Sequence, residues 1–137
     1  MNEARTVLDR ETFDVLLANE LKRALRSQSF VTLVVMEPRG ADVAAAVPEI
    51  RALVGRELRE TDMLAVDGTT VSMVLLDADL ERTSRVLERI RASLEHYQFA
   101  TPVAVRIGAA CCPTDGADIE TLKRAAAAAG AAGRDGP

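Results

Sequence analysis

The chain is poor in aromatic residues, cysteine and histidine. Of its 137 residues, aromatic residues make up 3%, and there are no tryptophans, two cysteines and one histidine. Hydrophobic residues still amount to 48%, which is enough to form a core. Because so few of them are aromatic, that core must consist mostly of aliphatic side chains and alanine. The length fits one compact domain.

The few cysteine and histidine residues argue against a zinc site. Cys111 and Cys112 are adjacent in the chain, so they lack the spacing of a zinc-binding pair and would form a disulfide only with strain. We expect reduced thiols that pack at a strand end, with a redox pair as the alternative. His96 is expected to interact with a helix dipole rather than with a metal. No metal site and no cofactor are therefore predicted.

The sequence also lacks an excess of positive charge and any long apolar run. The net charge is −4 and the pI is about 5.1, which argues against general binding of nucleic acid. No apolar run approaches the roughly 20 residues that span a bilayer. The first residues are polar and lead into an amphipathic segment, unlike a signal peptide. We therefore predict a cytoplasmic protein whose partners include neither nucleic acid nor a membrane.

Hydrophobic periodicity and turn residues predict the secondary structure. In chain order we expect a helix over 9–27, a strand over 30–36, a helix over 41–57, strands over 63–66 and 70–76, a helix that begins at Asp79, a strand over 102–110 and a helix that begins at Asp118. Pro38 lies in the segment 37–40 that should end the first strand, and Pro48 should divide the next helix in two. Asp67 and Gly68 should form a tight hairpin turn with positive φ at both residues.

The predicted buried face of the third helix consists of the following apolar residues: Leu80, Val86, Leu87, Ile90 and Leu94. The order of elements is a helix, then β-α-β-β-α-β, then a helix. Two β-α-β halves give the ferredoxin-like plan, an antiparallel-containing sheet with helices on one face. We expect one domain over residues 1–132, followed by a frayed tail over residues 133–137.

Residues 59–76, RETDMLAVDGTTVSMVLL, resemble the centre of the GGDEF (diguanylate cyclase) family. In that family an RxxD sequence precedes a β-hairpin, and the hairpin tip carries Gly-Gly-Asp/Glu-Glu-Phe. Arg59 and Asp62 match RxxD, whereas the signature reads GTTVS over residues 68–72. The segments LDRETF (8–13), LERIR (87–91), VRIGAA (105–110), DIETL (118–122) and GRD (133–135) are also similar to family motifs. The resemblance implies an α/β (α+β) GGDEF, nucleotidyl-cyclase-like fold with a ferredoxin-type sheet flanked by helices.

The same resemblance implies that catalysis has been lost. The family joins two GTP molecules with the help of metal ions held by carboxylates. Thr70 and Val71 stand at the signature carboxylates, and Glu37 is the only acidic residue near the end of the first strand, one place off. We therefore predict no catalytic residues and no enzyme activity. An enzyme would require Glu37, Asp67 and Asp77 to converge on a metal ion.

The RxxD motif implies a ligand site. In the family it is the inhibitory site for cyclic di-GMP, so the implied ligand-binding residues are Arg59, Asp62 and Arg89. Arginine forks suit phosphate and the guanine edge, and Asp62 would accept from guanine N1–H and N2–H. In the alternative interpretation, Arg59 and Asp62 form an ion pair at a strand entrance, and Asp62 bonds turn amides. Arg82, Arg85 and Arg89 would then be a solvated stripe.

The sequence therefore predicts a catalytically inactive GGDEF-like domain that regulates bacterial signalling. It would bind cyclic di-GMP, an unknown protein partner, or both. The alternative is a pure protein-interaction or homodimerisation domain with no nucleotide ligand. That alternative needs an exposed apolar patch or a symmetric dimer face.

Overall fold

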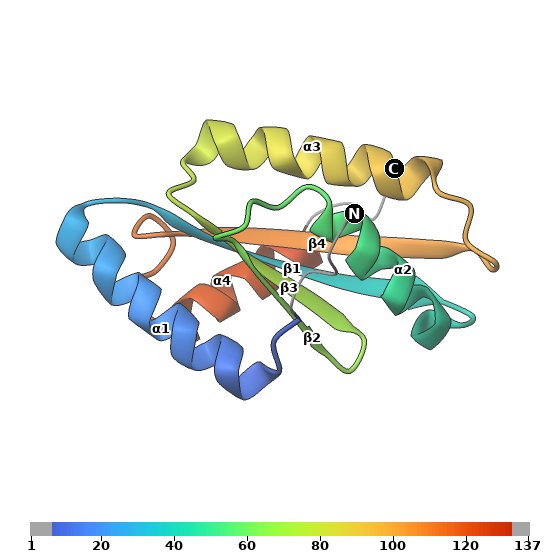
Figure 1. Ribbon diagram of the computed structural model, residues 1–137, viewed down its shortest axis with the longest axis horizontal. Coiled ribbons are helices and arrows are strands. Elements are labelled where there is room, and N and C mark those ends of the chain that lie inside the picture. The colour runs from blue at the N-terminus through green and yellow to red at the C-terminus, as the bar shows by residue number, and fades with distance from the viewer. Residues whose placement is uncertain (1–6, 133–137) are drawn as a thin grey trace.

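A computed structural model describes residues 7–132 of the chain (Figure 1). The elements are α1 (Arg10–Ser27), β1 (Val31–Gly40), α2 (Val43–Gly55), β2 (Met63–Asp67), β3 (Thr70–Leu76), α3 (Leu80–His96), β4 (Val103–Cys112) and α4 (Ile119–Ala132). The strands form one antiparallel sheet in the order β2-β3-β1-β4. This is the expected β-α-β-β-α-β core with one further helix at each end. The fold prediction is confirmed.

The sheet separates two layers of helices. α2 and α3 cover one face, as the ferredoxin-like plan requires, and α1 and α4 cover the other face (Figure 1). Successive β1 side chains point to opposite faces, so Val34 and Met36 pack under α2 and α3, whereas Leu33 packs under α1 and α4. Each face of the sheet thus has its own aliphatic core.

Aspartate residues cap the N-termini of the helices. Asp9, Asp79 and Asp118 each accept a hydrogen bond from the backbone N–H three residues on, over 2.8 Å, 2.9 Å and 2.8 Å. Helices were predicted to begin at these three aspartates, and the prediction is confirmed, because a capping hydrogen bond depends only on residues close in sequence. Asp42 caps α2 in the same way over 3.3 Å.

Two predictions about proline are wrong. β1 does not end at Met36 but continues through Pro38 to Gly40, still paired with β4. Pairing with β3 stops at Met36, so beyond that residue β1 has a neighbouring strand on one side only. A proline, which lacks a backbone N–H donor, is tolerated at such an edge position. Likewise, α2 is not divided at Pro48; it is one helix with Pro48 inside. Its buried apolar face offsets the single lost hydrogen bond.

The hairpin turn lies one residue further along than predicted. Asp67 pairs with Thr70 in the ladder, so the two loop residues are Gly68 and Thr69. Of these, only Gly68 has a positive φ, of 64°. A glycine at the first loop position is the pattern of a type II′ turn, which matches the twist of the two strands. The expected positive φ at Asp67 is wrong.

The ends of α3 and β4 also differ from prediction. Leu80 is 79% exposed because it is the first residue of α3 and precedes the buried stripe. β4 runs beyond Ala110 and includes both cysteines, which pair with the start of β1. The predicted tail, residues 133–137, lies outside the described residues. Within the described part of the chain, no helix is both long and apolar enough to cross a bilayer.

Candidate functional site

Asp62, the aspartate of the RxxD motif, faces the protein interior. Its side chain is 0% exposed. Oδ2 accepts from the backbone N–H of Arg59 over 2.9 Å, and Oδ1 accepts from the backbone N–H of Leu76 over 3.1 Å. Arg82 Nη2 lies 3.3 Å from Oδ2, and Arg82 Nη1 donates to the Leu76 carbonyl over 3.3 Å. The carboxylate thus joins the segment before β2 to the end of β3 and the start of α3.

This geometry matches the alternative in which Asp62 bonds backbone amides. That alternative also placed Arg82 on a solvated stripe, but its side chain is only 17% exposed and lies against Asp62. The contact between Arg82 and Asp62 could have been inferred from the sequence, because Arg82 lies in the first turn of α3, just after the strand that Asp62 contacts. A guanine could reach Asp62 only if that side chain left its internal donors. Ligand binding through Arg59, Asp62 and Arg89 stays a prediction.

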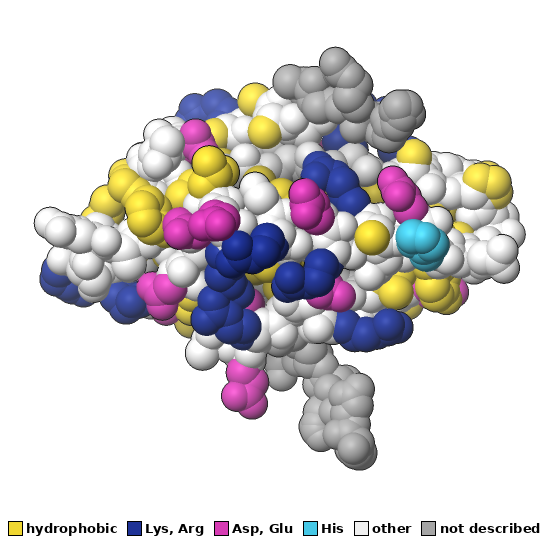
Figure 2. All heavy atoms as spheres, turned by 90° about the horizontal axis from the view of Figure 1, so that it is seen from above, with side chains coloured by type: hydrophobic (Ala, Val, Ile, Leu, Met, Phe, Trp, Pro, Cys, Tyr) yellow, Lys and Arg dark blue, Asp and Glu magenta, His cyan; other side chains and the backbone are white. Residues whose placement is uncertain are grey.

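Arg59 and Arg89 are more accessible. Arg59 is exposed, and Arg89 Nε donates to Glu57 Oε1 over 2.8 Å. Because Glu57 is two residues before Arg59, this contact ties α3 to the segment that carries the first arginine. Figure 2 looks onto the α3 side and shows Lys and Arg side chains gathered there, with acidic side chains between them.

The three carboxylates that an enzyme would need do not converge on one point, because Asp67 and Asp77 lie at opposite ends of β3. Asp67 is at the hairpin, where Oδ2 lies 3.5 Å from Arg10 Nε. Asp77 follows the opposite end of β3 and lies 3.9 Å from Arg23 Nη2. Glu37 is exposed on β1. Among the described residues, no three Asp, Glu, His or Cys side chains are placed to hold one metal ion.

The hairpin signature lies across the two faces of the sheet. Val71 is 0% exposed and packs in the core under α2 and α3. Thr70 and Ser72 are half-buried on the other face, where they line a cavity of about 200 Å³ between α1, α4 and the sheet. The cavity was not anticipated from the sequence, because its lining comes from five separate elements.

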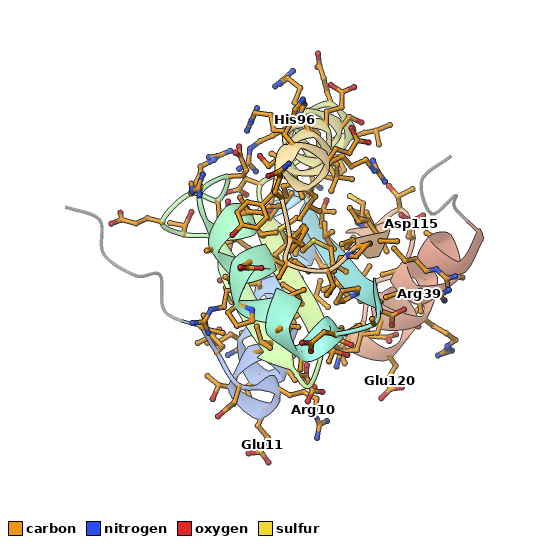
Figure 3. All side chains as sticks on the ribbon, turned by 90° about the vertical axis from the view of Figure 1, so that its right-hand side faces the viewer. Arg10, Glu11, Arg39, His96, Asp115 and Glu120 are labelled. Atoms are coloured by element: carbon orange, nitrogen blue, oxygen red, sulfur yellow. The ribbon has the colours of Figure 1, made fainter. Side chains whose placement is uncertain are left out.

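The lining of this cavity mixes apolar and charged groups. It comprises Arg10, Phe13, Asp14, Leu33, Val35, Ala65, Asp67, Thr70, Ser72, Lys123 and Ala127. In Figure 3, Arg10 lies beside the β2–β3 hairpin, whereas Glu11, the next residue of α1, points away from it. Asp14, one turn along α1, meets Lys123 of α4.

The two cysteines have no features of a redox site. Cys112 is buried and Cys111 is half-buried. Burial raises the pKa of both thiols, which lowers the fraction of reactive thiolate. His96 Nδ1 lies 2.8 Å from the Ala92 carbonyl oxygen in the last turn of α3. These contacts are consistent with packing and helix-end roles.

Solved structures of GGDEF domains share this fold. A DGC protein from Thermotoga maritima is 18% identical, with a TM-score of 0.81, and the match covers 91% of this chain and 96% of that one. The FimX GGDEF domain from Pseudomonas aeruginosa is 15% identical, with a TM-score of 0.81 and coverage of 96% and 91%. The GGDEF domain of DgcB from Caulobacter crescentus, in complex with c-di-GMP, is 17% identical, with a TM-score of 0.79 and coverage of 98% and 95%.

The class of protein that the structure defines is therefore an α+β domain with the GGDEF, diguanylate cyclase-like fold. In sequence, no protein-family model matches the chain, and no curated protein matches it. Identities of 15% to 18% establish the fold alone. What the domain does must be argued from its own residues.

Proposed function

We propose that this chain is a regulatory domain of GGDEF fold that takes part in signalling through a protein partner and does not make cyclic di-GMP. The observation that carries the proposal is the absence of acidic side chains at the two signature positions of the β2–β3 hairpin. Thr70 and Val71 stand at the two signature carboxylates, and Val71 is sealed in the core. Neither side chain can supply the negative charge that holds a divalent cation.

Phosphoryl transfer depends on positioning and on metal ions that neutralise developing charge. The acidic residue nearest the hairpin tip, Asp67, already lies beside Arg10. Glu37 projects from an exposed part of β1, away from Asp77. These placements support loss of catalysis and retention of the fold as a scaffold.

The test is an assay for turnover. Purified protein incubated with GTP and Mg²⁺ or Mn²⁺ should form no cyclic di-GMP above a heat-inactivated control, measured by chromatography. Product formation that disappears in Glu37→Ala would overturn the proposal, because it would show that this lone carboxylate supports catalysis.

An exposed apolar patch supports a protein partner. Leu25, Phe30 and Leu80 are 46%, 40% and 79% exposed. They lie at the end of the molecule where α1 ends and where β1 and α3 begin, and Figure 2 shows hydrophobic side chains grouped at that end. Exposed apolar groups of this kind commonly mark interaction surfaces. Sedimentation of the wild type and of Leu80→Glu distinguishes a homodimer, lost in the variant, from a monomer that awaits a different protein.

Binding of cyclic di-GMP is a second candidate function. It is favoured by the Arg89–Glu57 contact, which holds the two arginines Arg59 and Arg89 on neighbouring segments of one face. Two guanidinium forks can bind the phosphates of a dinucleotide. Because Asp62 is held inside the protein by its hydrogen bonds, its side chain would have to rearrange before it could contact a guanine.

Calorimetric titration with cyclic di-GMP and cyclic di-AMP tests this candidate. Binding should be micromolar, weaken as salt rises, and be lost in Arg59→Ala, whereas Arg91→Ala on the same helix serves as the matched control. A marked preference for the guanine dinucleotide would mean that Asp62 turns outward to the ligand. If the wild type gives no heat at high ligand excess, the interaction-domain function stands alone.

A further inference from the structure

We propose that the cavity between α1, α4 and the β2–β3 hairpin is a binding site for a small zwitterion with an apolar ring or branch, an aromatic or branched-chain α-amino acid. The cavity lies on the opposite face of the sheet from α3 and Arg89. It is therefore separate from the dinucleotide site considered above, and the proposal does not rest on that function.

The cavity exists because the sheet carries small side chains beneath it. Ser72 of β3 is flanked in register by Ala65 of β2 and Val35 of β1. All three line the cavity, with Leu33 and Phe13 completing an apolar floor and side. By the resemblance to the GGDEF signature, Ser72 of the segment GTTVS takes the place of the signature's phenylalanine. A serine there leaves unfilled the volume that a larger side chain would occupy.

The volume limits what can bind. An engineered apolar cavity of about 150 Å³ takes up benzene, whereas drug-sized ligands need roughly 300 Å³ or more. A cavity of about 200 Å³ therefore suits one ring, or one branched alkyl group, with a small polar head. A whole nucleotide is too large to be enclosed.

The charges around the cavity select a zwitterion. Arg10 and Asp14 are one turn apart on α1, and each faces an opposite charge. Arg10 Nε lies 3.5 Å from Asp67 Oδ2, and Lys123 Nζ lies 2.8 Å from Asp14 Oδ1. Two cations and two carboxylates give no net charge. A lone anion can pair only with the basic groups, and a lone cation only with the carboxylates, whereas a zwitterion can pair with both.

The Arg10–Asp67 ion pair can exchange partners with a ligand at low cost. The Arg10–Asp67 pair is more than 60% exposed at both side chains, and such surface pairs contribute little. The Lys123 ammonium donates to Asp14 Oδ2 over 3.0 Å and also lies 2.8 Å from Oδ1. A ligand ammonium would share the Asp14 carboxylate with Lys123, because a carboxylate can accept several donors, and the ligand carboxylate would bind Lys123 and the hydroxyls of Thr70 and Ser72.

Isothermal titration with three matched probes tests the proposal. L-phenylalanine has the ring and both charges, 3-phenylpropionate lacks the ammonium, and phenethylamine lacks the carboxylate. We expect L-phenylalanine to bind with a dissociation constant on the order of 0.1–1 mM, as its size allows, and each of the other two to bind at least roughly tenfold more weakly. Equal binding of all three, or binding of none, would overturn the proposal.

Variants locate the binding. Ser72→Phe fills the floor and Ala127→Leu narrows the α4 wall, so either should abolish the heat of L-phenylalanine binding while thermal unfolding shows a folded protein. Lys123→Gln should weaken binding, and Lys22→Gln, an exposed α1 position outside the cavity, should not. Arg89→Ala should also leave it unchanged. Unaltered binding in both filled variants would place the ligand elsewhere and refute the assignment.

Discussion

At the scale of single residues, Asp62 shows how a binding motif can serve the fold. Its carboxylate receives two backbone N–H groups from different segments and lies beside Arg82. Buried charges persist in proteins when they are paired and hydrogen-bonded in this way. The same residue cannot offer both oxygens to a ligand while these bonds are intact.

We therefore expect Asp62→Ala to lower the free energy of unfolding by about 2–4 kcal/mol, because two partly buried amides and one guanidinium lose their acceptor. Urea unfolding followed by circular dichroism measures the change. Glu60→Ala, an exposed neighbour in the same motif, is the matched control and should change stability by less than about 0.5 kcal/mol. Equal midpoints for the wild type and Asp62→Ala would contradict the structural role.

At the scale of elements, the β2–β3 hairpin depends on one glycine. Gly68 has a φ of 64°, and a Cβ added there would meet no atom within 4 Å. The cost of a side chain at this position is therefore conformational alone. We predict that Gly68→Ala destabilises the domain by about 1 kcal/mol, whereas Thr69→Ala, at a loop residue without a positive φ, has a much smaller effect. Thermal unfolding of both variants decides, and a larger loss in Thr69→Ala would show that the turn is placed wrongly.

The contact between α4 and β4 depends on another glycine. A Cβ at Gly108 would overlap the carbonyl oxygen of Ala126 and would lie 2.5 Å from the backbone nitrogen of Gly130. Backbone atoms cannot move aside as a flexible side chain can, so α4 would have to lift from the sheet.

Gly108→Ala should accordingly cost about 1–3 kcal/mol or more, the range of overpacked cores. The control is Ala104→Ser, an exposed position on the same strand. Denaturant unfolding gives the difference between the two variants. An increase in stability for Gly108→Ala would mean that the helix lies further from the sheet than described.

Local signals account for the elements that the sequence predicted well. The caps at Asp9, Asp79 and Asp118 depend on residues three positions away, and each helix begins where its aspartate indicates. The effect of Pro38 could not be foreseen, because it depends on which strands flank β1 at that point. The effect of a proline or a turn residue on a strand can be predicted only once the neighbouring strands are known.

At the scale of the whole molecule, the sheet divides the functional candidates between its two faces. Arg59 and Arg89 belong to the α3 side, and the cavity belongs to the side of α1 and α4. The arginines were found from a linear motif. The cavity could not be, because Ser72 and Lys123 are far apart in sequence and meet only when the fold forms.

The reactivity of the two thiols reports on how readily β4 separates from the rest of the sheet. Cys112 is 0% exposed and pairs with Val31 at the start of the central strand β1, while Cys111 is half-buried beside it. Burial is the largest cause of the raised pKa at each thiol. Exposure of Cys112 to a reagent therefore requires at least the end of β4 to separate from β1 and from the core.

We expect a disulfide reagent such as Ellman's to modify Cys111 slowly and Cys112 hardly at all in the folded protein at pH 7.5, with Cys111→Ser used to assign the two rates. Modification of Cys112 should rise with urea in parallel with loss of circular dichroism. The folded thiols keep their protons to higher pH than unfolded ones, whose ordinary pKa is 9.0. Their contribution to stability is thus intact below pH 9 and is lost as the pH rises through the raised values of the folded state. Rapid modification of both cysteines at pH 7.5, with unchanged circular dichroism, would show that β4 opens independently of the rest of the sheet.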